Sequence, residues 1–211
     1  MNEDINIYDI REYFSWRFKQ YGASPRGLDW NSTEAQTIRF NQLQKVIDPS
    51  QVYSLIDYGC GYGAFFDHLL KQGHSLHYQG FDIVDEMLEK GKQLFAGNPD
   101  CCFIQSERQL HRADYVVESG IFNVKLSTTA ATWTRHVIRT LDMMNSLAKK
   151  GLAFNMLTKY SDPEFMREDL YYADPCYFFD YCKKKYSKNV ALLHDYEIYD
   201  FTIIVRKKDE T

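Results

Sequence analysis

Cysteines are few in this sequence, and they are not arranged as disulfide frameworks or zinc sites usually are. Five occur in 211 residues, an odd number with no C-x-x-C pair: Cys60, Cys101, Cys102, Cys176 and Cys182. Small secreted scaffolds and zinc ribbons carry paired cysteines instead. His74 and His77 lie three residues apart but have no carboxylate or thiolate in register with them. We therefore expect reduced thiols that pack as small apolar residues, and no metal site.

Long apolar runs are also absent. No segment approaches the roughly 18 consecutive apolar residues that a membrane-spanning helix requires. Residues 1–8 are polar and acidic, and they lack the basic segment followed by an apolar one that opens a secretory signal. These absences predict a cytoplasmic protein with no membrane partner.

The sequence also has no excess of basic over acidic residues. The formal net charge is −4, whereas domains that grip nucleic acid usually carry a basic surface that neutralises phosphates. Two short lysine runs, at residues 183–185 and 207–208, are better explained as solvated charge. This balance argues against a nucleic-acid partner.

Strand-like and helix-like segments alternate along the middle of the chain. Short apolar runs bounded by turn residues predict strands at residues 52–57, 76–83, 101–105, 113–119 and 151–157. Apolar residues at helical spacing predict helices through residues 65–70, 86–94 and 129–149. Such alternation is typical of a parallel sheet covered by helices on both faces.

The two ends of the chain depart from this alternation. Residues 1–50 predict helices only, with a break at residues 22–27 and a second helix capped by the hydroxyl of Ser32. An aromatic-rich helical segment is expected at about residues 160–188. Two closely spaced strands then follow, which predicts an antiparallel hairpin because no crossover helix fits between them. The length suits one domain covering the whole chain.

A glycine-rich turn follows the first predicted strand, in the segment LIDYGCGYGAFFDHL. Glycine lets a backbone approach a ligand closely because no Cβ intervenes, and ligands of open parallel sheets bind beyond the carboxyl ends of the strands. Gly59, Gly61 and Ala64 satisfy the dinucleotide spacing G-x-G-x-x-[GA], and Asp82 follows at a distance suited to ribose hydroxyls. The spacing alone leaves two ligand classes open, nicotinamide dinucleotides and S-adenosylmethionine.

Three segments together resemble class I S-adenosylmethionine-dependent methyltransferases. DYGCGYG is similar to the first motif of that family, and GFDIVDEML to the strand segment whose acidic residue holds the cofactor ribose. The closing segments NVALLHDY and DFTIIVRK are similar to the family's sixth and seventh strands. The resemblance covers residues 35–211. It implies a Rossmann-like three-layer α/β sandwich with a mostly parallel seven-stranded sheet and an antiparallel C-terminal strand, and a reaction that leaves S-adenosylhomocysteine.

Charge and length favour S-adenosylmethionine over a dinucleotide. Asp57, at the end of the first strand, is placed to attract the ammonium of a methionine tail and would repel a pyrophosphate. A chain of 211 residues also leaves little room for the second nucleotide-binding half of a dehydrogenase.

The resemblance implies a set of cofactor-binding residues. They are Arg39, Asp57, Gly59, Cys60, Gly61, Asp82, Ile83, Ser106, Glu107, Glu118 and Ser119. Asp82 would hold both ribose hydroxyls, and Ile83 would pack on the adenine or in the core. Arg39 would reach the cofactor carboxylate or form a salt bridge. The aspartate that commonly meets the adenine is missing, so Gln105, Ser106 or Glu107 would replace it.

The acceptor side needs fewer specific residues, because the methyl donor is already activated and chiefly requires alignment and exclusion of water. His136 is the candidate general base, and Trp133, Tyr171 and Tyr172 are candidate walls of the acceptor pocket; each of them otherwise packs in the core or lies at the surface. The segment after the fourth strand lacks the N-P-P-Y type motif of enzymes that methylate nucleobase amino groups.

Aromatic residues in the N-terminal 50 residues and in the 160–188 segment are suited to form a lid and a cover over the site. We therefore expect a methyltransferase, a monomer or homodimer, acting on oxygen or nitrogen of a small molecule. Two alternatives stay open: methylation of protein or RNA, and a partner subunit that binds the cofactor without catalysis.

Overall fold

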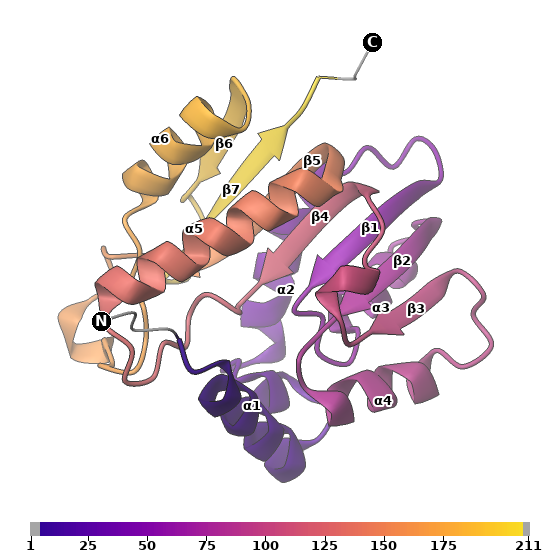
Figure 1. Cartoon of the computed structure of the whole chain (residues 1–211), viewed down its shortest axis with the longest axis horizontal. Coiled ribbons are helices and arrows are strands. Elements are labelled where there is room, and N and C mark those ends of the chain that lie inside the picture. Colours follow the sequence, from indigo (N-terminus) through magenta and orange to yellow (C-terminus); the bar gives the residue numbers. More distant parts are fainter. Residues whose placement is uncertain (1–4, 209–211) are drawn as a thin grey trace.

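The computed structural model describes residues 5–208, and its centre is a seven-stranded sheet between two layers of helices (Figure 1). The strand order is β3-β2-β1-β4-β5-β7-β6. The strands are β1 Tyr53–Tyr58, β2 Leu76–Phe81, β3 Cys101–Ile104, β4 Ala113–Ser119, β5 Ala148–Leu157, β6 Asn189–Leu193 and β7 Asp200–Arg206. β7 runs antiparallel to both of its neighbours, β5 and β6, whereas the other neighbouring strands pair in parallel. This arrangement confirms the predicted fold class.

Six α-helices accompany the sheet within the described residues. They are α1 Ile7–Tyr21, α2 Thr33–Leu43, α3 Ala64–Lys71, α4 Asp85–Leu94, α5 Ala130–Leu147 and α6 Pro175–Lys185. Side chains of α2, α3 and α4 pack in the core on one face of the sheet. Those of α5 and α6 pack in the core on the other face, and α5 crosses in front of the sheet in Figure 1. The sheet is therefore covered on both sides, as its apolar central strands require.

Local sequence explains where several elements begin and end. The Ser32 hydroxyl accepts a hydrogen bond from the Ala35 amide (3.1 Å) and so caps α2 as predicted. Gly73, in the left-handed region at φ 81°, ends α3 by donating its N–H to Leu70. The helix α5 ends at Leu147, two residues before the predicted position, because Ala148 already pairs with Ala113 of β4.

The predicted cover at residues 160–188 contains one short helical turn, Pro163–Phe165, and then α6. The aspartate before α6, Asp174, accepts hydrogen bonds from the amides of Cys176 and Tyr177 and caps that helix. Between them, residues 166–173 form an irregular segment that makes isolated bridges to Val124 and Thr158. This segment lies beyond the end of β5, at the same edge of the sheet as the glycine turn.

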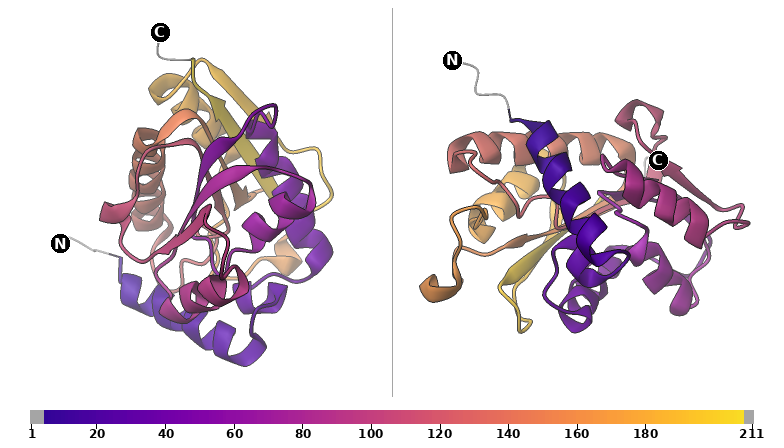
Figure 2. Two further views of the ribbon diagram at one scale, coloured as in Figure 1. Left: turned by 90° about the vertical axis from the view of Figure 1, so that its right-hand side faces the viewer. Right: turned by 90° about the horizontal axis from the view of Figure 1, so that it is seen from below.

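The N-terminal segment lies across the carboxyl ends of the parallel strands, where Figure 2 shows α1 beside α4. A single 3-10 turn, η1 Pro25–Leu28, follows α1 and leads into α2. We call residues 5–32 the N-terminal segment below. Its position places helical and aromatic side chains directly over the turn after β1.

Within residues 5–208, no helix has the length and apolar character needed to cross a membrane. The same residues contain no group of three or more His, Cys, Asp or Glu side chains that could hold a metal ion.

Candidate active site

The turn after β1 has a backbone shape that only glycine adopts readily. Gly59, Gly61 and Gly63 all have positive φ angles, of 86°, 55° and 87°. A Cβ at Gly59 would lie 2.1 Å from Cγ2 of Ile121, and one at Gly61 would lie 2.6 Å from Cδ2 of Leu28. The amides of Gly59 and Cys60 both donate to the Phe81 carbonyl, at 2.7 and 2.9 Å, which fixes the turn to the end of β2. The turn thus exposes bare backbone.

Asp82 lies beside this turn, at the end of β2, and is 8% exposed. Its Oδ2 accepts a hydrogen bond from the Gly61 amide (2.7 Å), and its Oδ1 accepts one from the Val84 amide (2.9 Å). Burial raises the pKa of this carboxyl group, while the backbone donors oppose the rise. Each carboxylate oxygen can accept a further hydrogen bond, so the group suits two neighbouring hydroxyls such as those of a ribose.

A cavity of about 290 Å³ opens over the turn and Asp82. Eight of the predicted site residues line it: Gly59, Gly61, Asp82, Ile83, Glu107, Ser119, Trp133 and His136. Side chains of the N-terminal segment form the opposite wall: Ile7, Ile10, Phe14, Leu28 and Trp30. We call this space the first cavity. Its size is close to the lower end of the roughly 300–1,000 Å³ typical of ligand pockets.

Among the three candidates for adenine recognition, Glu107 is the one on the wall of the first cavity. Its carboxylate accepts a hydrogen bond from the Tyr58 hydroxyl. Gln105 instead donates its side-chain amide to Asp85, and Ser106 is exposed. Ile83 lines the same cavity.

Three predicted cofactor residues lie behind the cavity wall. Asp57 is 3% exposed and accepts a hydrogen bond from the Tyr78 hydroxyl (2.8 Å). Glu118 is fully buried, and its Oε1 accepts the Ile121 amide (2.7 Å), while its Oε2 has no partner in the described part of the chain. Burial raises the pKa of Asp57 to about 7. It also raises the pKa of the Glu118 carboxyl and that of the Cys60 thiol well above their usual values. Cys60 is also buried, and its backbone amide donates the hydrogen bond to Phe81 that holds the turn in place.

A second cavity, of about 400 Å³, adjoins the first. The two share the side chains of Phe14, Leu28 and Trp30 and the backbone of Gly120 as walls. The remaining walls are mostly polar or aromatic: Asp29, Asn31, Arg39, Asn123, Val124, Leu157, Ser161, Phe165, Arg167, Leu170, Tyr172 and Tyr199. The two cavities are therefore immediate neighbours that share one wall.

Arg39 lines the second cavity, where it forms the salt bridge that was one of its two predicted roles. Its Nε and Nη2 donate to the carboxylate of Asp200, which is fully buried, and its Nη1 donates to the Ala35 carbonyl (2.9 Å). The guanidinium also lies 4.3 Å from the ring centre of Trp30. These contacts engage all three nitrogens.

The predicted acceptor residues are divided between different surroundings. Trp133 is 1% exposed and donates its indole N–H to the Phe122 carbonyl (2.7 Å), while His136 packs 5.0 Å from the Trp133 ring. Burial lowers the pKa of His136. Tyr172 lines the second cavity. Tyr171 is buried against Thr134 (2.7 Å between hydroxyl oxygens) and lines neither cavity.

Several cavity residues carry no sequence signal that marks them. Asp29, Asn123 and Arg167 line the second cavity, although they belong to three segments far apart in the chain. Asp29 follows a glycine and proline break, and Arg167 lies in the irregular part of the cover. No spacing rule connects such positions, because only the folded chain brings them together.

Comparisons with known proteins identify relatives of this chain. The family described as methyltransferase domain matches residues 11–190. A Mycobacterium tuberculosis protein named "Putative methyltransferase Rv1506c" is 48% identical over 163 residues, which is 77% of this chain and 98% of that protein.

Solved structures share the fold at low sequence identity. The magnesium protoporphyrin IX methyltransferase of Synechocystis PCC 6803, solved with bound S-adenosylmethionine, is 14% identical with a TM-score of 0.60, covering 98% of this chain and 100% of that one. Human N-acetylserotonin methyltransferase, also in complex with S-adenosylmethionine, is 14% identical with a TM-score of 0.64, covering 93% and 59%. The chain belongs to the methyltransferase domain family and has the class I, S-adenosylmethionine-dependent methyltransferase fold that its glycine turn and closing hairpin predicted.

Proposed function

We propose that this protein transfers a methyl group from S-adenosylmethionine to an oxygen or nitrogen atom of a small-molecule acceptor. The observation that carries the proposal is the pair of adjoining cavities, one built on the glycine turn and Asp82, the other lined by polar groups. A donor and an acceptor in these cavities would meet at their common wall. When bound, S-adenosylmethionine supplies a methyl group made electrophilic by its positively charged sulfur.

The residues of the first cavity fit this cofactor. The backbone of Gly59 and Gly61, which lines this cavity, would accommodate a methionine tail, and Asp82 would receive the ribose hydroxyls. Ile83 and Glu107 would flank the adenine, and Ser119 the sulfonium end. Asp57 and Glu118 lie buried behind the turn, outside the lining of the first cavity.

The residues of the chain would contribute chiefly by positioning the two reactants and by excluding water from them. Trp133 and His136 form the floor of the first cavity from α5, and the N-terminal segment covers it as a lid. Exclusion of water and alignment of the two reactants are the largest contributions that such a site can make. Because lid and cover enclose the second cavity from both sides, we favour a small acceptor over a macromolecule.

Calorimetric titration with S-adenosylmethionine, S-adenosylhomocysteine and NAD tests the cofactor site. We expect micromolar binding of the two sulfur compounds, no binding of NAD, and loss of binding in Asp82→Ala. Binding of NAD alone would contradict the proposal. Asp180→Asn serves as the matched control, because Asp180 is exposed and its carboxylate pairs with Lys184 on the same helix, α6.

Release of S-adenosylhomocysteine in the presence of fractionated extracts tests the acceptor class. We expect turnover with small-metabolite fractions. Turnover with RNA or protein fractions only would assign the acceptor to a macromolecule, and cofactor binding without turnover in any fraction would identify a non-catalytic subunit.

A further inference from the structure

We propose that the second cavity binds a neutral acceptor rich in hydroxyl groups, of the chemical class of a sugar ring, and that Asp29 receives the proton of the hydroxyl that becomes methylated. This inference rests on the proposed function and specifies its acceptor. Three observations lead to it: the pairing of the charges in the cavity, the kinds of polar group on its walls, and the position of Asp29.

The charged side chains on the wall are already paired with protein groups. Arg39 is bound through two nitrogens to Asp200. Arg167 contacts Asp169 with Nη2–Oδ2 2.5 Å, and Asp29 contacts Arg17 with Oδ1–Nη2 2.7 Å. A carboxylate or phosphate ligand would have to compete with Asp200 and Asp169 for these guanidinium groups. The cavity therefore favours an uncharged ligand.

The polar groups on the wall are hydroxyls and amides that can still hydrogen-bond. The Tyr172 hydroxyl accepts the Arg167 amide (2.9 Å), which leaves its own proton to donate. Asn123 uses its Oδ1 for the Leu157 amide (3.1 Å), so its NH₂ group supplies donors, and Asn31 offers a complete side-chain amide. A largely apolar acceptor would give these groups no hydrogen-bond partner in place of the water it displaces, which costs free energy.

Aromatic rings complete the lining. Trp30 lies on the wall shared with the first cavity, and Phe165 and Tyr199 pack together near the outer end with their ring centres 6.1 Å apart. Rings of this kind offer flat apolar surface next to hydrogen-bonding groups. A sugar ring presents the matching combination, with C–H groups on its faces and hydroxyls at its edge.

Asp29 lines the second cavity and is followed in sequence by Trp30, which lines both cavities. Ring carbons of Trp30 lie within 2.6 Å of where a Cβ on Gly120 would be, and Gly120 also lines both cavities. The Asp29 Oδ2 accepts the Tyr13 hydroxyl (2.8 Å), and Arg17 holds Oδ1. Its side chain is 14% exposed. Each oxygen keeps a lone pair for an acceptor hydroxyl.

His136, the other candidate base, lines only the first cavity. The carboxylate of Asp29 is therefore the group on the acceptor's own side. In the transfer, the acceptor oxygen uses a lone pair to bond the methyl carbon. The carbon–sulfur bond breaks, its electron pair stays on sulfur, and the hydroxyl proton passes to the Asp29 carboxylate and then to water.

Binding is tested first, on the whole protein saturated with S-adenosylhomocysteine. Saturation-transfer NMR is recorded with a panel of neutral methyl pyranosides, a uronic acid, a sugar phosphate, catechol and benzoate. We expect transfer to the neutral pyranosides only, weakened at least tenfold in Asn31→Ala and in Tyr172→Phe. Tyr160→Phe is the matched control, because Tyr160 is 60% exposed and lines neither cavity.

Proton transfer is tested with Asp29→Asn on whichever pyranoside is methylated. Asparagine tolerates the left-handed backbone of residue 29 (φ 62°) and can still accept a hydrogen bond from Tyr13, while the charge that pairs with Arg17 is removed. We expect kcat to fall roughly 100-fold or more. The Kd of S-adenosylhomocysteine should stay within about twofold.

The outcomes separate this inference from the proposed function. Binding of S-adenosylhomocysteine together with preference for the anionic ligands or for catechol would overturn the inference and leave the methyltransferase proposal intact. So would binding of none of the panel, or an unchanged kcat in Asp29→Asn. Failure of S-adenosylhomocysteine itself to bind would overturn both.

Discussion

At the scale of single residues, Gly61 connects the backbone of the turn to the side chain that covers it. Its φ of 55° is costly for alanine, by about 1–2 kcal/mol, and the added Cβ would meet Leu28. We expect Gly61→Ala to weaken binding of S-adenosylhomocysteine at least tenfold, measured by calorimetry. Adding Leu28→Ala to this variant should restore only part of the binding affinity, because the backbone strain at residue 61 remains.

Gly97 supplies the control for that comparison. It also has a positive φ, 88°, but a Cβ there would have nothing within 4 Å. Gly97→Ala should therefore lower the free energy of unfolding by a similar amount, because the backbone strain is similar, and should leave cofactor binding unchanged. Equal loss of binding in the two variants would mean that the turn acts through general stability and not through contact with the ligand.

Asp57 makes stability depend on pH. Burial raises its pKa from 3.8 to about 7, so the folded state favours the protonated form. Its contribution to stability is complete below pH 4 and is lost as the pH rises through 7, a change on the order of 4 kcal/mol at most. In urea unfolding between pH 4.5 and 7.5, Asp57→Asn should lose less stability than the unchanged chain. Parallel losses in both proteins would contradict this assignment.

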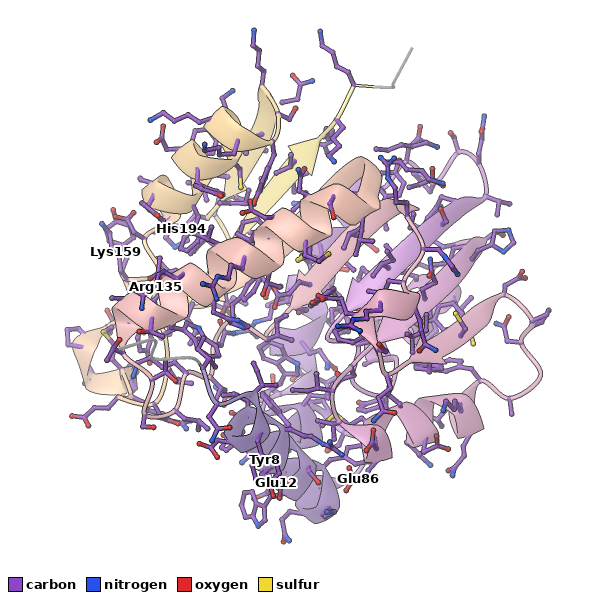
Figure 3. All side chains as sticks on the ribbon, in the orientation of Figure 1. Tyr8, Glu12, Glu86, Arg135, Lys159 and His194 are labelled. Carbon is purple, nitrogen blue, oxygen red and sulfur yellow. The ribbon has the colours of Figure 1, made fainter. Side chains whose placement is uncertain are left out.

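At the scale of elements, polar contacts join α1 to the start of α4. The Arg11 guanidinium lies 2.5 Å from Asp85, and the Glu86 carboxylate, labelled in Figure 3, receives Ser15 (2.9 Å) and Lys19 (2.9 Å). Lys19 and the other donors lower the pKa of Glu86 to about 2, so it stays charged above that pH. These contacts hold the proposed lid closed over the first cavity.

Glu86→Gln should loosen the lid with little effect on the fold. Exposed ion pairs are worth about 1 kcal/mol or less, so the free energy of unfolding should change by no more than that. We expect S-adenosylhomocysteine to dissociate severalfold faster, measured by stopped-flow tryptophan fluorescence. Glu89→Gln is the control, since Glu89 pairs with Lys92 on the same helix. Identical dissociation rates in both variants would exclude this role of α1.

The sequence predicted the positions of the helices and strands well, and the contacts between them less well. Local signals were sufficient for β4, for the cap at Ser32 and for the glycine turn, because each depends on neighbouring residues. The division of predicted acceptor residues between two cavities was not predictable. It depends on contacts such as Arg39 with Asp200, which are 161 residues apart, and no local pattern carries that information.

At the scale of the whole molecule, cofactor binding should stabilise the entire chain. A ligand that binds only the folded state at 100 times its Kd adds about 2.7 kcal/mol, which corresponds to roughly 5–10 °C in Tm for a chain of this size. We expect such a shift with S-adenosylhomocysteine, measured by calorimetry, and none with NAD. An equal shift in Asp82→Ala would show that the ligand binds elsewhere.

The pairing of Arg39 with Asp200 also has a consequence for synthesis on the ribosome. Asp200 is the first residue of β7, so the buried guanidinium on α2 meets its partner only after a further 161 residues have been translated. β7 also has to enter between β5 and β6, a pairing that cannot form from the growing N-terminal part alone. The nascent chain can therefore build its cofactor turn early, whereas the wall of the second cavity is completed last.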